Sequence, residues 1–207
     1  EVCQHVKDKI KSTELDEITA KICADKVLEN PDYNELATRL VVSDNHKSNR
    51  DWQDFSSITR LIDSHNPDRF SPIYLSLVEK FSSELDREMK YARDYLTFDY
   101  FGYKTLEGKY LISTVVKNHI VRERPQHLWM RVALEIHRDD LPRVIEMYHD
   151  LSQFYYNHAT PTLYNSGHIH NQLGSCFLAA GHDSIEGMHE NARRIAHISK
   201  HSDGISY

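Results

Sequence analysis

Residues 158–187, HATPTLYNSGHIHNQLGSCFLAAGHDSIEG, are the most informative part of the chain for its architecture. A residue before proline is pushed into extended conformation, so the run 159–164 is predicted to be a strand ending at the Asn-Ser-Gly turn that follows. The run 173–180 is short and mostly apolar between turn signals, which predicts a strand buried on both faces. Residues 183–186, DSIE, have the form of a capping box. Together these signals predict strand, loop, strand and capped helix, with the thiol of Cys176 in the second strand.

The residues before this stretch predict a helical scaffold. Apolar residues recur at intervals of three and four, which is the spacing of one helix face. Thr13 is a suitable N-cap, proline follows Ser71 and Arg124 at first helical positions, and Asp139 or Asp140 can cap the last helix. The helices predicted in this way cover residues 13–30, 33–45, 51–64, 71–85, 124–136 and 141–158.

Residues 94–112 differ from the rest of this scaffold. The segment is rich in Tyr and Phe, and Gly102 and Gly108 interrupt it. These features favour an irregular aromatic segment or a short hairpin over a helix.

The composition excludes several classes of protein. The chain has 207 residues, of which 40% are hydrophobic and 27% charged, as in an ordinary globular protein. Its net charge of −6 provides no basic footprint for nucleic acid or an anionic membrane. No apolar run approaches the roughly 18 residues needed to cross a bilayer. Cys3, Cys23 and Cys176 are odd in number and widely spaced, which argues against a disulfide framework and for a reducing, cytoplasmic location.

Five blocks of the sequence carry a resemblance to a known family. They read YLTFDYFGYKTLEGKYLI, ERPQHLWMRVALEIH, HATPTLYNSG, QLGSCFL and DSIEG. With these blocks the chain resembles the large, catalytic subunit of class I ribonucleotide reductase, and it is most like the eukaryotic and viral branch of that family. The similarity covers almost the whole chain and is most specific between residues 99 and 187.

The resemblance implies a domain organisation. The family's large subunit has an N-terminal nucleotide-binding cone, a helical domain and a ten-stranded α/β barrel that holds the active site. Residues 1–12 would then be the end of the cone, 13–157 the helical domain and 158–207 the start of the barrel. The expected fold class is mainly α, with the first strands and helix of an incomplete α/β barrel.

The resemblance also implies a chemistry, the reduction of ribonucleotides to deoxyribonucleotides for DNA replication by a radical route. The reaction uses a thiyl radical and a pair of reducing thiols, and Cys176 matches one of that pair. A thiol beside the ribose can donate hydrogen and end in a disulfide that exchange resets. Ser175 and Thr160 match positions whose hydroxyls bond the substrate's sugar and phosphate end. Gly204 is the glycine retained from a glycine-rich turn at the substrate.

A second set of residues matches the family's allosteric specificity site. Asp183 and Ser184 correspond to positions that bind a deoxynucleoside triphosphate effector at a dimer interface, and Lys200 to a position that could meet its phosphates. Asp183 could instead simply cap the helix, and the two roles can coexist. The family's SKSAGGIG block reads SKHSDGISY here, and its Asp203 is electrostatically unfavourable beside a diphosphate.

The expected partners follow from the same resemblance. They are a ribonucleoside diphosphate, dNTP or ATP effectors, the remainder of the large subunit, a second large subunit, and a metal-containing small subunit that supplies the radical. The segment itself is expected to bind no cofactor directly. Because the sequence stops at Tyr207, before the other catalytic residues, the isolated chain is expected to be inactive. The alternative is a degenerate, non-catalytic reductase-like protein that acts through protein contacts.

The chain's fourteen histidines suggest a competing hypothesis. His168 and His170 lie in one loop, and His197 and His201 are four residues apart, so the four could together hold a metal. No HExxH motif or carboxylate pair accompanies them. We therefore expect no functional metal site here.

Overall fold

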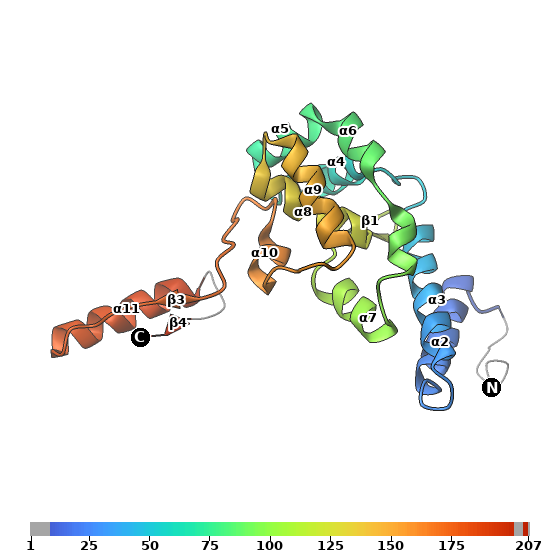
Figure 1. Cartoon of the computed structure of the whole chain (residues 1–207), viewed down its shortest axis with the longest axis horizontal. Coiled ribbons are helices and arrows are strands. Elements are labelled where there is room, and N and C mark those ends of the chain that lie inside the picture. The colour runs from blue at the N-terminus through green and yellow to red at the C-terminus, as the bar shows by residue number, and fades with distance from the viewer. Residues whose placement is uncertain (1–8, 201–204, 207) are drawn as a thin grey trace.

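The computed structural model describes residues 9–200 and 205–206, and in these residues the chain is mainly helical, as expected (Figure 1). Residues 1–8 of the predicted cone remnant lie outside the described residues. The helices are α2 (Ser12–Asp25), α3 (Asp32–Ser48), α4 (Phe55–His65), α5 (Pro72–Lys80), α6 (Ser82–Glu88), the 3-10 helix η1 (Tyr91–Tyr95), α7 (Tyr100–Lys109), α8 (Pro125–His137), α9 (Leu141–Ser152), α10 (Thr160–Asn165) and α11 (Ile185–Ser199). The strands are β1 (Ser113–Val116), β2 (His119–Arg122), β3 (Phe177–Leu178) and β4 (Ile205–Ser206).

Helix α8 is the centre of the larger hydrophobic core. Eleven of its thirteen residues are buried, so the helix is covered on all sides rather than on one face. Leu128, Trp129 and Met130 are almost completely inaccessible to solvent, and α4, α5 and α9 supply apolar residues to the same cluster. The segment that holds the ERPQHLWMRVALEIH block therefore forms the central helix of the helical body.

A smaller hydrophobic core lies between α2, α3 and α7. Polar side chains on the last turns of α3 connect it to the larger core. Asn45 Nδ2 donates to the carbonyl of Glu123 at 3.1 Å, and His46 Nε2 lies 2.8 Å from a carboxylate oxygen of the fully buried Asp94. The two cores are thus joined through hydrogen bonds at this contact.

The local start signals of several helices are confirmed. The hydroxyl of Ser71 accepts a hydrogen bond from the Tyr74 amide at 3.1 Å, with proline at the first helical position of α5. Asp140 caps α9 by accepting from the amide of Arg143. Helix α9 ends at Ser152, six residues before the predicted end, because the chain turns away from it there.

The expectation for residues 94–112 is wrong, because the segment forms η1 and α7. Asp99 caps α7 by accepting from the Gly102 amide at 2.6 Å. Tyr100, Tyr103 and Leu106 recur every three residues and are buried, so packing outweighs the weak helix propensity of the aromatic residues. The hairpin lies just beyond this segment, in β1 and β2.

Two expectations for the opening stretch are also wrong. Residues 159–164 do not form a strand: Ala159 is extended, and Thr160 begins the short helix α10 with Pro161 in its first turn, where the missing N–H costs no hydrogen bond. In the run 173–180 only β3 is a strand, and it is not buried, since Leu178 is 91% exposed.

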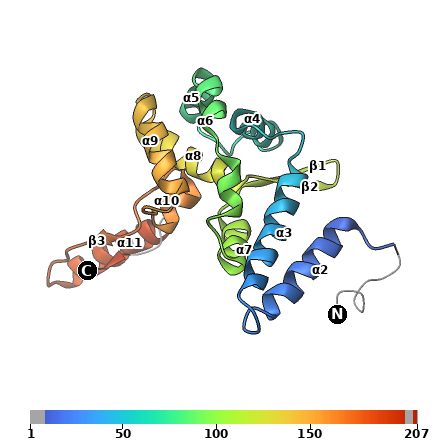
Figure 2. The same cartoon turned by 45° about the vertical axis from the view of Figure 1, so that its right-hand side comes forward.

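The end of the described chain forms a β-α-β unit. Strands β3 and β4 pair in parallel, with α11 as the crossover between them. Parallel neighbours need such a crossover, and this unit is the building block of α/β folds. Figures 1 and 2 show the unit at the opposite side of the helical body from α2 and α3. A helical domain followed by the start of an α/β barrel accounts for this order.

Candidate functional site

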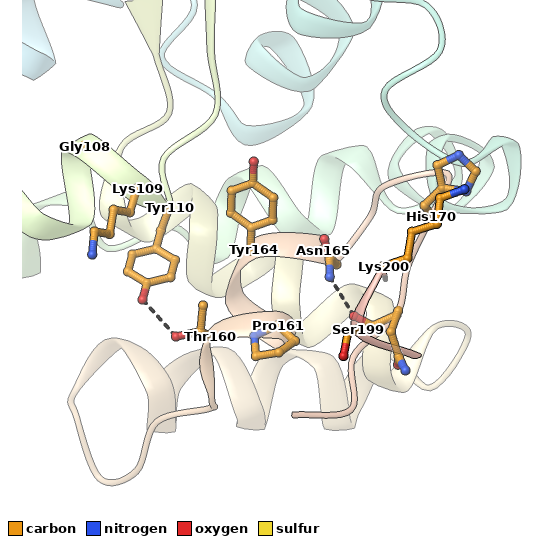
Figure 3. A pocket seen from close by; sticks show the side chains of 11 residues that line it. Gly108, Lys109, Tyr110, Thr160, Pro161, Tyr164, Asn165, His170, Ser199 and Lys200 are labelled. Carbon is orange, nitrogen blue, oxygen red and sulfur yellow. Dashed lines mark hydrogen bonds between the residues drawn. The ribbon is translucent and has the colours of Figure 1, made fainter. Parts of the chain in front are cut away.

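A cleft of about 760 Å³ lies where the helical body meets the β-α-β unit (Figure 3). One wall is the end of α7 and the residue after it, the second is α10, and the third consists of the following loop and the end of α11. The described residues that line the cleft are Gly108, Lys109, Tyr110, Thr160, Pro161, Tyr164, Asn165, His170, Gln172, Ser199 and Lys200.

Hydrogen bonds hold these walls together. The hydroxyl of Tyr110 lies 3.0 Å from that of Thr160 and joins the first wall to the second (Figure 3). Asn165 Nδ2 donates to the carbonyl of Gln172 at 2.7 Å, which fastens the following loop to α10. The α7 wall, α10 and the following loop are therefore bonded to one another before any ligand enters.

The cleft is suited to an anion. The ammonium groups of Lys109 and Lys200 form no ion pair with any described residue, and the exposed His170 also lines the cleft. None of the described residues lining the cleft is acidic. Hydroxyls and amides supply the remaining polar groups, and these are the donors that bind phosphate oxygens in proteins.

The predicted substrate and effector residues that the structure describes lie in three places, which are the cleft, the segment before β3 and the start of α11. Thr160 and Lys200, 40 positions apart, line this one cleft. Ser175 and Cys176 lie just before β3 and do not line it, and the Cys176 thiol is exposed, with the Ser175 hydroxyl 3.8 Å from its sulfur. Gly204 lies outside the described residues.

Asp183 and Ser184 are at the start of α11, but their local roles differ from the predicted capping box. Ser184, and not Asp183, is the N-cap: its hydroxyl accepts from the Gly187 amide at 3.0 Å. The cap is therefore shifted by one residue, and the exposed Asp183 carboxylate is not used by it. Asp183 instead borders a second cavity of about 630 Å³ between α11 and the segment before it.

Metal-ligating side chains do not converge in the described part of the chain. His168 packs between the rings of Phe70 and Tyr164, each with its centroid 6.1 Å away. Burial, with smaller effects of Arg131 and Arg69, lowers the pKa of His168 to about 3. It is thus a neutral packing residue, while His201 lies outside the described residues.

Sequence reasoning missed several residues of the cleft, chiefly Lys109, Tyr110 and Asn165. They lie within the recognised blocks, but none has a spacing that marks it as a binding residue. Only the contact between the end of α7 and α10, 50 positions apart, brings Tyr110 to Thr160.

The fold and the cleft define the described chain as a helical domain that leads into an α/β barrel, with a cationic cleft at the junction. No described helix is both long enough and apolar enough to pass through a membrane. Residues 96–170 match the family model described as the ribonucleotide reductase all-alpha domain.

Similarity to curated proteins extends beyond that domain. The chain is 41% identical to the ribonucleoside-diphosphate reductase large subunit of Plasmodium falciparum (isolate Dd2), over 95% of this chain and 24% of that protein. It is also 41% identical to the large subunits of Arabidopsis thaliana and Variola virus, and each match covers 99% of this chain. The matched part is 25% of the Arabidopsis thaliana protein and 27% of the Variola virus protein. The chain spans about a quarter of the length of these relatives. It belongs to the ribonucleotide reductase large-subunit family and matches the N-terminal portion of those proteins.

Proposed function

We propose that the cleft between α7, α10 and the end of α11 holds the diphosphate end of a ribonucleoside diphosphate. The observation that carries this proposal is the lining: two lysines without ion pairs, hydroxyls and amides, and no acidic residue among the described ones. Thr160 would donate its hydroxyl to a phosphate oxygen, and Lys109 and Lys200 would balance the phosphate charge.

The size of the cleft supports the same ligand. A volume of about 760 Å³ falls within the roughly 300–1,000 Å³ of small-molecule pockets. Lys200, which the family resemblance links to the effector, lines the same cleft as Thr160, which that resemblance links to the substrate. In our proposal Lys200 therefore contributes to the substrate's phosphate site.

Cys176 is proposed as one of two reducing thiols in the complete protein. In the net reaction the ribose 2′-hydroxyl leaves as water, a hydrogen takes its place, and two thiols become one disulfide. The exposure of the Cys176 sulfur supports this role, because thiol–disulfide exchange needs access to the thiol. The buried Cys23, whose pKa is raised by burial, lacks that access.

The complete reaction needs more than these residues. We propose that a deoxynucleoside triphosphate effector contacts Asp183 and Ser184, exposed at the start of α11. A second large subunit and a radical-generating small subunit would complete the enzyme. The 207-residue chain by itself should form no deoxynucleotide, and measurable product from the purified chain with a small subunit would contradict this.

Binding to the purified chain tests the phosphate site. Cytidine 5′-diphosphate and inorganic pyrophosphate are titrated by calorimetry or by amide NMR shifts. We expect Thr160→Val and Lys200→Ala each to weaken binding of both ligands by roughly tenfold, the value of one hydrogen bond to a charged group. The matched controls are Thr105→Val, at an exposed position of α7, and Lys80→Ala on α5, and both should bind as the unaltered chain does. Equal effects of controls and cleft variants, or no binding at all, would refute the site.

A further inference from the structure

We infer that Arg131 is a positioning residue that sets the spacing between the α7 wall and the α10 wall of the cleft. The role of the cleft as a phosphate site rests on the proposed function. The geometry of Arg131 does not depend on it. Arg131 lies in the middle of α8, its side chain is completely buried, and it does not itself line the cleft.

The guanidinium of Arg131 donates to carbonyls on both walls. Nη2 donates to the carbonyl of Tyr110 at 3.2 Å, on the first wall. Nη1 donates to the carbonyl of Ser166 at 2.7 Å and to that of Leu163 at 3.3 Å, at the end of α10. One rigid, planar group therefore fixes the distance between two backbone segments that are about 50 residues apart in the sequence.

A buried carboxylate fixes the guanidinium in turn. Glu123, 2% exposed, accepts from Arg131 Nε at 3.0 Å and from Nη2 at 3.2 Å. The same carboxylate accepts from the amide of Ile112 at 2.9 Å, two residues after Tyr110. A buried charge is tolerated only when it is paired and fully hydrogen-bonded, and this arrangement satisfies both conditions.

Arg131 affects the cleft through Tyr110, whose carbonyl it bonds and whose hydroxyl reaches Thr160. Tyr110 is held by its carbonyl, and its hydroxyl meets Thr160 at 3.0 Å at the opposite end of α10 from Ser166. If the clamp loosens, the first wall and α10 can shift independently, and the Thr160 hydroxyl loses its defined place beside Tyr110. The phosphate donors are thus aligned by a residue that never touches the phosphate.

Lysine cannot replace this arginine geometrically. Its ammonium keeps the charge but places all donors on one nitrogen, whereas the guanidinium spreads five N–H donors over a rigid fork. Arg131→Lys should therefore retain the ion pair with Glu123 but lose carbonyl contacts on one wall. Arg124→Lys is a matched control, because Arg124 is also buried, at the start of α8, but bonds Asn49, the residue that follows α3.

The experiment combines two measurements on the 207-residue chain. Without ligand, hydrogen exchange should become faster in both wall segments, 108–112 and 159–167, of Arg131→Lys, and stay unchanged there in Arg124→Lys. With inorganic pyrophosphate, Arg131→Lys should bind roughly tenfold more weakly, as after loss of one hydrogen bond to a charged group. Combined with Tyr110→Phe, the loss should be smaller than the product of the two single losses, because both changes release the same contact.

Each result decides between a clamp and ordinary structural support. Unchanged exchange in the wall segments of a folded Arg131→Lys, or independent effects of Tyr110→Phe and Arg131→Lys, would overturn the inference. Failure of the unaltered chain to bind pyrophosphate would sink the proposed function, while the exchange data would still test the clamp. If Arg131→Lys does not fold, the clamp is tested in the unaltered chain by the NMR chemical shift of the Arg131 Nε–H. It should shift on pyrophosphate binding while that of Arg124 stays fixed, and equal behaviour of the two would refute the clamp.

Discussion

Replacing His127 by glutamine should make the helical body markedly less sensitive to mild acid. The His127 ring is completely buried in the first turn of α8. Its Nδ1 accepts from the Arg124 amide at 3.0 Å, and its Nε2 lies 3.1 Å from the carbonyl of Gln53. These partners require a neutral ring with the proton on Nε2, and a protonated ring would lose the acceptor at Nδ1.

The size of the effect follows from the pKa. Burial, assisted by the nearby Arg124 charge, lowers the pKa of His127 from its usual 6.5 to about 3. A histidine whose pKa is depressed by folding adds stability above its unfolded pKa and loses that contribution as the pH falls toward the folded pKa. Between pH 7 and pH 5 this one residue should remove about 2 kcal/mol from the free energy of unfolding, at about 1.4 kcal/mol per pH unit below pH 6.

Urea unfolding measured from pH 7 to pH 4.5 tests this value. Glutamine at this position can accept from the same Arg124 amide, as in a capping box, so His127→Gln keeps a local partner without the titrating ring. Half-buried His168, whose pKa is also lowered by burial, adds to the slope of both proteins. Burial raises the pKa of Asp94, so its contribution has the opposite sign and is lost as the pH rises. The contributions of His168 and Asp94 are present in both proteins, so they cancel when the slope of His127→Gln is subtracted from that of the unaltered chain.

The exposed His65 provides the control for this change. His65→Gln changes a histidine whose ring is exposed at the end of α4, and it should leave the slope unchanged. If His127→Gln loses stability in acid as steeply as the unaltered chain, the buried neutral ring does not cause the acid sensitivity and the reasoning fails.

Two further changes test the turn at Gly167 and the N-cap of α5. Gly167→Ala should destabilise the chain by about 1–3 kcal/mol in thermal or urea melts, because Gly167 has φ of 79° and an added Cβ would lie 3.1 Å from the Tyr74 ring. Gly108→Ala, with nothing within 4 Å of the new Cβ, should cost no stability, and equal effects of the two would contradict this account. Ser71→Ala should cost about 1 kcal/mol through loss of the α5 cap, whereas Ser71→Thr should cost less; identical losses would exclude the capping hydroxyl as the cause.

The candidate site was predictable from the sequence only in part. The family resemblance selected Thr160 and Lys200, and the structure places both on one cleft. It gave no indication of Lys109 or Tyr110, because a side chain 50 residues away becomes a neighbour only through packing. The chemical roles of Cys176, Asp183 and the other assigned residues remain predictions of the resemblance.

The sequence by itself determined the elements whose signals are local. The Ser71 cap with its proline, the Asp140 cap and the three-and-four spacing of apolar residues operate within one or two helical turns, so they can be recognised from neighbouring residues alone. They made the helical body and most of its helix starts predictable.

Only the tertiary structure decided α7, α10 and the cleft. The aromatic segment became a helix because Tyr100, Tyr103 and Leu106 gain more from burial than their propensities cost. The residues before the Asn-Ser-Gly turn became α10, whose terminal carbonyls accept hydrogen bonds from the buried Arg131. In both places contacts between distant residues outweighed the local preference, since the energy of burying and bonding a segment exceeds the small differences among backbone propensities.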